Sequence, residues 1–275
     1  MDMTTGKTWF ITGASRGLGR AFTEAALHAG DRVVAAARDV EPLREPAVAH
    51  PDRLFPLSVD VSDRRAVFEA VEQAVALVGE LDVVVNNAGG MLYGMVEEAT
   101  EDQIRAHLDV NFFGAVWVVQ AVLPRLRAQG HGRILQVTSM GTAGGMAAVG
   151  YYGAGKAALA SLTEALAMEV EPFGIKVTNL EMGGYDTGLF TAGTTATAAL
   201  PHYEPLREEL ARMWGDEPGP APSSAAPVIM KLVELENPPR RLIVGGNSFD
   251  QVADLYAARS DGYRAWESLS RLASG

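Results

Sequence analysis

Two hydrophobic patterns alternate along the chain. Short runs that are apolar at nearly every position, such as 81–85, are typical of strands buried on both faces of a parallel sheet. Longer segments separate them, in which apolar residues recur every three or four positions, the period of an amphipathic helix. Strands are expected at residues 7–12, 32–37, 54–61, 81–85, 132–139, 175–180 and 241–244, and helices at about 20–27, 62–79, 101–129, 152–171, 202–214 and 250–272.

This alternation predicts an α/β fold, because strands that alternate with helices pair in parallel through right-handed crossovers. We expect a Rossmann-type doubly wound parallel sheet of about seven strands, with helices on both faces, in a single domain over residues 1–275. The pattern breaks at about residues 184–228, and an irregular insertion of this kind is often a lid. A helical extension occupies about residues 247–275, and its Trp266 is expected to pack on the body of the domain.

Charge and composition narrow the range of partners. The 275 residues carry a net charge of −11 at pH 7, which disfavours nucleic acid and anionic membranes. The sequence contains no cysteine, and its histidines are scattered without metal-ligand spacing, so we expect neither thiol chemistry nor a metal site. The longest apolar tract, 112–123, is too short to span a bilayer. Because the first residues also lack the pattern of a signal peptide, we expect a cytoplasmic location.

A glycine-rich turn joins the first expected strand to the first expected helix. Gly13, Gly17 and Gly19 lie in the sequence Gly-Ala-Ser-Arg-Gly-Leu-Gly. Glycines in this place let the backbone approach a pyrophosphate, and the N-terminus of the helix supplies amide donors and a favourable dipole. Three glycines alone are a weak signal, so the flanking strand and helix and the following strand at 32–37 are what favour a dinucleotide site.

The end of the second expected strand indicates which dinucleotide is bound. Enzymes that use NAD usually carry an acidic residue there, which binds the 2′-hydroxyl of the ribose. Here Ala37 occupies that position and Arg38 follows, with a second guanidinium at Arg16 in the glycine-rich turn. Because guanidinium groups match the geometry of a phosphate, these residues favour NADP(H). The alternative is that both arginines are simply solvated.

Ser139, Tyr152 and Lys156 are the candidates for the chemistry. Tyr152 and Lys156 are four residues apart on an expected helix and share one face, while Ser139 ends a strand at the edge where ligands bind. A nearby ammonium group lowers the pKa of a phenol, which suits it for proton transfer near neutral pH. The alternative is an ordinary solvated helix face. Tyr151 lies off the shared face and is expected to be a wall or core residue.

Further polar residues follow other strands or interrupt a helix. Asp60 ends the third strand, and Asn86-Asn87-Ala88-Gly89 follows the fourth, where small residues let a nucleotide pass and carboxamides can join strands. Asn111 lies in the middle of the helix at 101–129, where asparagine is mildly unfavourable. It therefore has either a functional task or a hydrogen bond in the core.

In combination these motifs resemble the short-chain dehydrogenase/reductase family over nearly the whole chain. The resemblance implies a catalytic tetrad of Asn111, Ser139, Tyr152 and Lys156. It implies that NADP(H) is held by Gly13, Ser15, Arg16, Gly17, Leu18, Gly19, Arg38, Asp60, Val61, Asn87, Ala88, Gly89, Tyr152, Lys156, Gly183 and Thr187. The segments 237–246 and 266–270 resemble the 17β-hydroxysteroid-dehydrogenase-like branch. Met182 departs from the family, which usually has proline before this glycine, and the backbone there is freer.

The resemblance also implies a reaction, in which hydride from NADPH reduces a carbonyl group, or the reverse. Tyr152 would give the proton, Lys156 would lower the pKa of Tyr152 and hold the nicotinamide ribose, and Ser139 would bond the carbonyl oxygen. Asn111 would hold a water that feeds protons to Lys156. The expected pocket wall is apolar and rich in methionine, which favours a hydrophobic small-molecule carbonyl substrate. It comprises Tyr93, Met140, Met146, Val149 and Tyr185.

The sequence leaves alternatives for the oligomeric state and for the function. In the family, helices that correspond to 101–129 and 152–171 pair across a two-fold axis, so we expect a homodimer or a homotetramer. An imine or enoyl reductase, or an epimerase with tightly held NADP, would use the same scaffold. A non-catalytic NADP(H)-sensing protein would bind the cofactor and a partner, although a complete tetrad argues against this reading.

Overall fold

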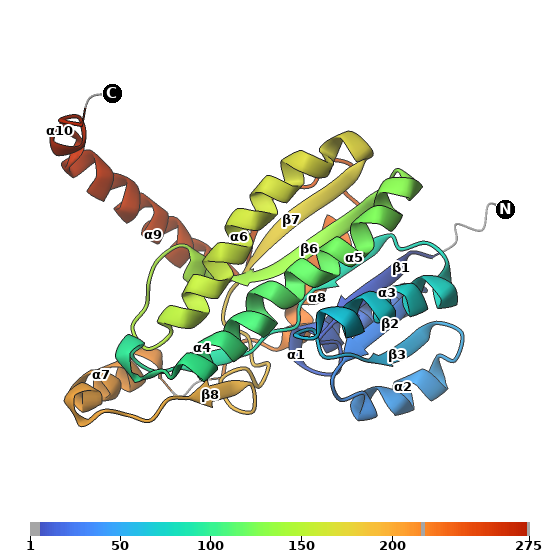
Figure 1. Cartoon of the computed structure of the whole chain (residues 1–275), viewed down its shortest axis with the longest axis horizontal. Coiled ribbons are helices and arrows are strands. Elements are labelled where there is room, and N and C mark those ends of the chain that lie inside the picture. The colour runs from blue at the N-terminus through green and yellow to red at the C-terminus, as the bar shows by residue number, and fades with distance from the viewer. Residues whose placement is uncertain (1–5, 216–217, 274–275) are drawn as a thin grey trace.

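The computed structural model describes residues 6–215 and 218–273. Its main sheet is wholly parallel and has the strand order β3-β2-β1-β4-β6-β7-β9 (Figure 1). The strands are β1 (Thr8–Thr12), β2 (Arg32–Ala37), β3 (Leu54–Ser58), β4 (Val83–Asn86), β6 (Gly132–Ser139), β7 (Ile175–Met182) and β9 (Arg241–Val244). The predicted doubly wound sheet is confirmed. Its order reverses between β1 and β4, the place where such sheets bind ligands.

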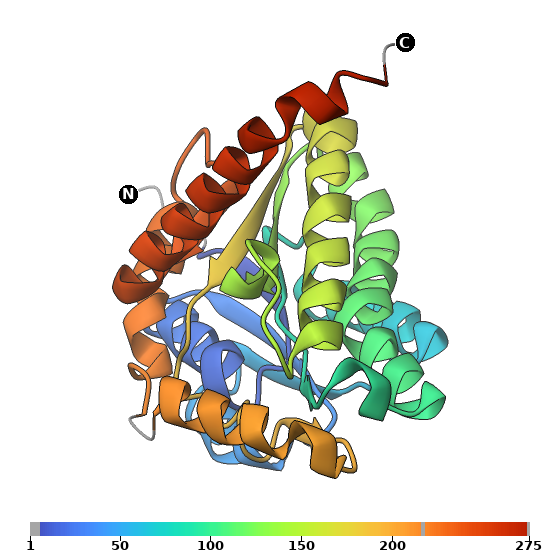
Figure 2. The ribbon, with the colours of Figure 1, turned by 90° about the vertical axis from the view of Figure 1, so that its left-hand side faces the viewer.

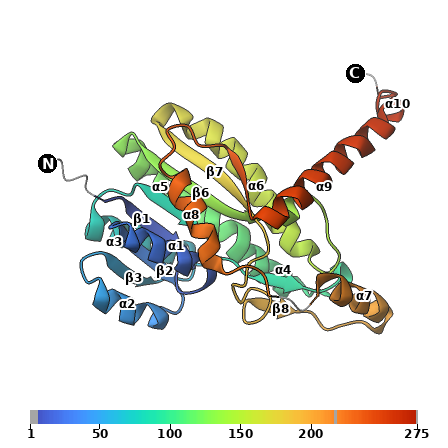
Figure 3. The same cartoon turned by 180° about the vertical axis from the view of Figure 1, so that it is seen from behind.

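Helices cover both faces of this sheet. One face carries α3 (Arg64–Val78), α5 (Gly114–Gln129) and α6 (Gly150–Val170), as Figure 1 shows. The other face, seen in Figure 3, carries α1 (Gly17–His28), α2 (Arg44–Ala49) and α8 (Ala226–Leu232). Local signals set the ends of these helices. Asp63, for example, begins α3 by accepting hydrogen bonds from the backbone N–H groups of Arg65 and Ala66.

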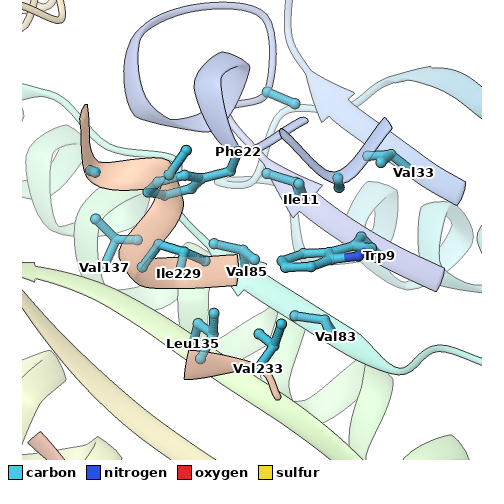
Figure 4. Close-up of a cluster of buried hydrophobic side chains, with 14 of the residues drawn as sticks. Trp9, Ile11, Phe22, Val33, Val83, Val85, Leu135, Val137, Ile229 and Val233 are labelled. Carbon is cyan, nitrogen blue, oxygen red and sulfur yellow. The ribbon is translucent and has the colours of Figure 1, made fainter. Parts of the chain in front are cut away.

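Both faces of the sheet are buried, which is why the strands lack a polar face. On β1, Trp9 and Ile11 join one core cluster and Phe10 joins the other. Figure 4 shows the first cluster, in which Phe22 of α1 and Ile229 of α8 lie over the strand side chains. The Trp9 indole donates a hydrogen bond of 2.8 Å to Asp31, so its one polar atom is satisfied inside the core.

The helix expected at 101–129 is not a single α-helix. It consists of α4 (Glu101–Leu108), a π-helical turn (Asp109–Phe113) and α5. Asn111 lies in this turn. Single π-helical turns inside α-helices are frequent at functional sites. The prediction of one regular helix was therefore wrong at Asn111.

The same continuous run, Glu101–Gln129, is long and apolar enough to cross a membrane by length and composition. Core helices of folded domains pass the same test. Here Val118, Val119, Val122 and Leu126 of this run are buried in the second core cluster with residues of the sheet and of α3. The apolar character of the run is therefore explained by its place in the core.

The insertion, residues 184–228, contains more regular structure than its sequence suggested. Its strand β8 (Thr194–Ala196) pairs in parallel with β5 (Met91–Tyr93) in a separate two-stranded sheet. The expected short helix is present as α7 (Glu204–Trp214). Residues 216–217 of the insertion lie outside the described part of the chain.

The C-terminal extension forms a helix that leaves the body of the molecule. Helix α9 (Gly246–Ala265) and the short α10 (Glu267–Ser270) project outward in Figures 1 and 3, and in Figure 2 they run diagonally across the view. Trp266 is 66% exposed near the outer end, so the expectation that it packs on the body was wrong. The inner half of α9 is held by the buried Val252 and by Tyr256, which donates a hydrogen bond of 3.1 Å to the buried carboxylate of Glu181. Residues 274–275 lie outside the described chain.

Candidate active site

The glycine-rich turn has a backbone geometry that strongly favours glycine. Gly13 and Gly17 have φ values of 64° and 55°, in the left-handed region that favours glycine. A Cβ atom on Gly19 would lie 2.3 Å from the carbonyl oxygen of Gly13 and 2.5 Å from Nδ2 of Asn87. The backbone thus turns tightly from β1 into α1, which leaves the N–H groups at the start of α1 available to an anion.

A hydrogen-bond network joins this turn to the segment after β4. The Thr12 hydroxyl accepts from the backbone N–H groups of Asn87 and Ala88 at 3.0 and 3.1 Å. In return, the Asn87 side chain donates to the carbonyl oxygens of Thr12 and Gly13 at 2.9 and 3.1 Å. The carboxamide was expected to join neighbouring strands, and this is what Asn87 does.

The other residues assigned to the cofactor lie around the same edge of the sheet. Ala37 is buried at the end of β2, whereas Arg38 is exposed beside it. Asp60 is also exposed, and its carboxylate accepts hydrogen bonds from the backbone and the hydroxyl of Ser62. Val61 is buried against Gly114, where a Cβ atom would lie 2.8 Å from the Val61 side chain. Arg38 and Arg16 form no ion pair within the described residues.

The insertion lies directly against the glycine-rich turn. A Cβ atom on Gly17 would lie 2.9 Å from the Cβ of Thr187, and one on Gly193 would lie 3.1 Å from the Arg16 guanidinium. Arg16 therefore faces the insertion in this structure, whereas Arg38 stands apart at the end of β2. Thr187 is placed beside the turn, as its assignment to the cofactor requires.

Met182 does not disturb the strand that it ends. It is buried and pairs with Val244, so β7 continues to this residue, and the backbone N–H of Gly183 donates to Val244 at 2.9 Å. A Cβ atom on Gly183 would lie 2.0 Å from Oγ of Ser248 at the start of α9. The glycine is therefore required by close packing, and the ladder to β9 replaces the rigidity that a proline would give.

Ser139, Tyr152 and Lys156 come together at the carboxyl end of β6. The Lys156 ammonium lies 5.9 Å from the centre of the Tyr152 ring and donates a hydrogen bond of 2.9 Å to the carbonyl oxygen of Val137. All three side chains are buried, and Tyr152 and Lys156 are only 8% and 4% exposed. Tyr151 instead points away and donates to the carbonyl oxygen of Val96.

Burial is the main cause of the pKa shifts of Tyr152 and Lys156. It raises the pKa of the Tyr152 phenol, and hydrogen bonding with the Ser139 hydroxyl only partly lowers it. The expectation that Lys156 lowers the pKa of Tyr152 is therefore not met in this structure. The reason is that Lys156 is itself buried, which lowers its own pKa to about 8 and weakens its hold on a proton.

Asn111 completes the constellation from the π-helical turn. Its Oδ1 accepts a hydrogen bond of 3.2 Å from the backbone N–H of Gly90. A Cβ atom on Gly89 would lie 2.9 Å from this oxygen and 3.4 Å from Nζ of Lys156. The four residues assigned to catalysis thus lie within one small region, and Gly89 leaves the space between Asn111 and Lys156 free of a side chain.

An apolar cluster surrounds the Tyr152 ring. It consists of Met91, Val149 and Tyr152 with Tyr93 and Leu189 packed against them. Two of the expected wall residues, Tyr93 and Val149, are therefore in place. Met146 lies near Gly141 and is 39% exposed, and Met140 is half-buried. Tyr185 belongs to the core cluster on the other face of the sheet, away from Tyr152.

Glu98, which the sequence did not single out, fastens the insertion beside this cluster. Its buried carboxylate accepts hydrogen bonds from the backbone N–H groups of Met95 and Leu200, from the Thr197 hydroxyl and from the Arg207 guanidinium. Burial by itself raises the pKa of Glu98, but these donors outweigh it and lower the pKa to about 2. Nothing in the sequence marks a single glutamate in a loop as an anchor for residues a hundred positions away.

Comparison with known proteins identifies the family. The model of the short chain dehydrogenase family matches residues 7–197. The chain belongs to the short-chain dehydrogenase family. It is 37% identical over 269 residues to oxidoreductase BOA17 of Botryotinia fuckeliana, which covers 96% of this chain and 98% of that protein. It is 34% identical to the 3-ketodihydrosphingosine reductase of Bacteroides thetaiotaomicron, over 86% of each chain.

Solved structures of short-chain dehydrogenases share the fold. One from Streptomyces avermitilis is 36% identical and has a TM-score of 0.92 over 98% of this chain and 100% of that chain. An alcohol dehydrogenase from Thermococcus sibiricus, complexed with 5-hydroxy-NADP, is 26% identical and has a TM-score of 0.72 over 86% of this chain and 95% of that chain. The protein is therefore an oxidoreductase of this family. Its assignment to the 17β-hydroxysteroid-dehydrogenase-like branch stays a prediction.

Proposed function

We propose that this short-chain dehydrogenase is an NADPH-dependent reductase of a ketone or aldehyde on a hydrophobic small molecule, or catalyses the reverse oxidation. The observation that carries the proposal is the meeting of Ser139, Tyr152 and Lys156 at one sheet edge, inside an apolar cluster. No group of three or more potential metal ligands exists within residues 6–215 and 218–273, so the proposal uses no metal.

The residues around the glycine-rich turn fit a dinucleotide. Gly13 and Gly17 adopt the backbone that the turn needs, and Gly89 leaves room beside Asn111 and Lys156 that a Cβ atom would fill. Turn residues 13–19, the segment after β4 and Thr187 would hold the cofactor. When bound, NADPH supplies the hydride.

The chain's own side chains would handle the proton and the charge. The Tyr152 hydroxyl donates its proton to the carbonyl oxygen as negative charge develops there, and the raised pKa keeps the phenol protonated until that moment. Ser139 donates a hydrogen bond to the same oxygen. Lys156, with a pKa of about 8, holds its proton less firmly than Tyr152 does and passes it to the phenolate that remains.

The substrate class follows from the surroundings of Tyr152. The side chains packed with Tyr152 are apolar and uncharged, which suits a hydrophobic carbonyl compound. They are Met91, Tyr93, Val149 and Leu189. The name of the Bacteroides thetaiotaomicron relative, 3-ketodihydrosphingosine reductase, describes the reduction of a keto group, which supports a carbonyl substrate.

The test is a panel of hydrophobic ketones, aldehydes, imines and enones, incubated with NADPH, with isolation of the products. We expect NADPH consumption with carbonyl compounds and an alcohol as product. An amine, a saturated ketone or an epimerised product would instead assign an imine reductase, an enoyl reductase or an epimerase. NADPH binding without turnover across the panel would favour a sensing role.

NADPH should be preferred over NADH because Arg38 stands exposed beside the neutral Ala37. Arg38→Ala should reduce the preference by about 1–3 kcal/mol, the value of a lost charge-assisted hydrogen bond. The measurement is kcat/KM for both cofactors. Arg44→Ala is the control, since Arg44 is also exposed but is paired with Glu41. Equal kcat/KM for NADPH and NADH in the unmodified protein would refute the preference.

We propose that the protein is a cytoplasmic homodimer or homotetramer. Met168 on α6 and Phe113 before α5 are 58% and 39% exposed, and such apolar groups suit an interface between copies. Light scattering at micromolar concentration should give the mass of two or four chains. Met168→Asp should shift the mass toward one chain, whereas Val48→Asp on α2 should not. A monomeric unmodified protein would contradict the proposal.

A further inference from the structure

His107 is a buried histidine that the proposed reaction does not use. It lies in α4, one helical turn before Asn111, and is 8% exposed. Its ring centre lies 6.2 Å from that of Tyr152. Its position next to two residues of the proposed site raises the question of what it does there.

Both hydrogens of the Asn111 side-chain amide are directed toward His107. Nδ2 of Asn111 donates to the carbonyl oxygen of His107 at 2.9 Å and lies 3.2 Å from Nδ1 of its ring. An amide nitrogen has two hydrogens, so these contacts use both. With the nitrogen fixed in this way, Oδ1 must point to the opposite side, where it accepts from Gly90 and borders the space at Gly89 and Lys156.

This arrangement requires one form of the imidazole. Nδ1 can accept from Asn111 only if it carries no hydrogen, so the proton of the neutral ring must be on Nε2. Burial lowers the pKa of His107 to about 4, and the charge of Lys156 acts in the same direction. On α6, the helix that faces the ring, the titratable groups are Tyr152 and Lys156. The ring is therefore neutral at neutral pH.

We propose that His107 is a positioning residue that fixes the side-chain amide of Asn111, so that its carbonyl oxygen faces Gly89 and Lys156. If the amide were reversed, Oδ1 would face the backbone carbonyl oxygen of His107, and an NH₂ group would face the backbone N–H of Gly90 and the ammonium of Lys156. The inference rests on the proposed function, because a correctly oriented Asn111 matters for proton supply to Lys156.

Two variants and a double-mutant cycle test this role. His107→Phe keeps a ring and removes the acceptor, and should lower kcat by about 3- to 10-fold, as for one lost hydrogen bond. It should leave the KM for NADPH unchanged. His107→Asn places an oxygen near the position of Nδ1 and should restore at least about half of kcat. In an Asn111→Ala background, His107→Phe should cause little further loss.

Other kinetic results would overturn the inference. If the losses from His107→Phe and Asn111→Ala multiply, His107 does not act through Asn111. The same holds if His107→Asn is as impaired as His107→Phe while both variants keep the unfolding temperature of the unmodified protein.

A measurement without turnover separates this inference from the proposed function. Side-chain ¹⁵N NMR of the histidines should show His107, identified by its loss in His107→Phe, as the neutral form with the proton on Nε2 at pH 7. In Asn111→Ala, its Nδ1 resonance should move, because the ring loses its donor. A proton on Nδ1, a charged ring, or an unmoved resonance would refute the positioning role even if the protein reduces carbonyl compounds. The expected spectra from a protein that reduces none would uphold the orientation of Asn111 and reject only the reductase.

Discussion

Tyr152→Phe should remove nearly all turnover and leave NADPH binding almost intact. Phenylalanine keeps the ring that packs with Met91 and Val149, so the apolar cluster should survive. The variant deletes only the hydroxyl, which is the proposed proton donor. General acid catalysis typically contributes about 10²–10⁴-fold to the rate, and loss of a hydrogen bond to the developing oxyanion should add to this. The measurements are kcat with a panel substrate and NADPH affinity by fluorescence titration.

Tyr151→Phe is the matched control. Tyr151 precedes Tyr152 in the same helix, but its hydroxyl is bound to the carbonyl oxygen of Val96 and should have no part in the reaction. This variant should retain most activity. If Tyr151→Phe were inactive and Tyr152→Phe normal, the catalytic phenol would have been chosen wrongly. If both were active, the proton would come from another group.

Lys156→Met should abolish most turnover and weaken NADPH binding, yet make the protein more stable at pH 7. Burial lowers the pKa of Lys156 from 10.5 to about 8. At 1.36 kcal/mol per pKa unit, burying this charge costs on the order of 3 kcal/mol. Methionine avoids that cost but loses the hydrogen bond to Val137, so the net gain should be about 1–2 kcal/mol.

The pH dependence of this gain gives a sharper check. Below pH 8 the lysine is charged in both the folded and the unfolded protein, and the cost of burial is fully present. Between about pH 8 and 10.5 the folded protein loses the proton while the unfolded chain keeps it, so the stability of the unmodified protein rises. The advantage of Lys156→Met should therefore shrink across this window.

Chemical denaturation at pH 7, 8, 9 and 10 measures this advantage. Lys231→Met on α8 is the control, because that lysine is exposed, and its effect should not vary with pH. A destabilised Lys156→Met protein at pH 7, or a difference that grows as the pH rises, would contradict the argument.

The main sheet could be predicted because its strands are apolar on both faces. Residues 83–85 and 33–37 have apolar side chains on both faces, and only a parallel sheet covered by two helical layers buries both. The glycine-rich turn could also be predicted, since Gly13 and Gly17 adopt positive φ values that other residues rarely adopt. Strand ends were less certain, and β3 ends at Ser58 rather than Val61.

The remaining features depend on contacts between distant residues. Strands β5 and β8 have three residues each, too few for a periodic pattern, and they exist because the insertion crosses over the segment after β4. The π-helical turn at Asn111 depends on how α4 and α5 meet the sheet. Trp266 looked like a core residue by its size alone, but it follows the outer end of α9 and is 66% exposed.

The site was predicted in part for the same reason. Tyr152 and Lys156 follow from their four-residue spacing, because one helix fixes both. His107 and Asn111 have the same spacing, but neither histidine nor asparagine signals a partner until the π-helical turn and the approach of α6 are known. The pKa of Tyr152 depends on its burial among residues from distant parts of the chain, such as Met91 and Leu189, which no local pattern encodes.

The low pKa of Glu98 affects how the pH dependence of the reaction rate is interpreted. Its pKa is about 2 in the folded protein, against 4.5 for a free carboxyl group, so its bonds contribute stability above pH 4.5 and lose it as the pH falls toward 2. The insertion should consequently remain fastened in all ordinary assay buffers. A change in reaction rate between pH 6 and 9 would then report on the proposed proton transfer at Tyr152, and not on release of the insertion from Glu98.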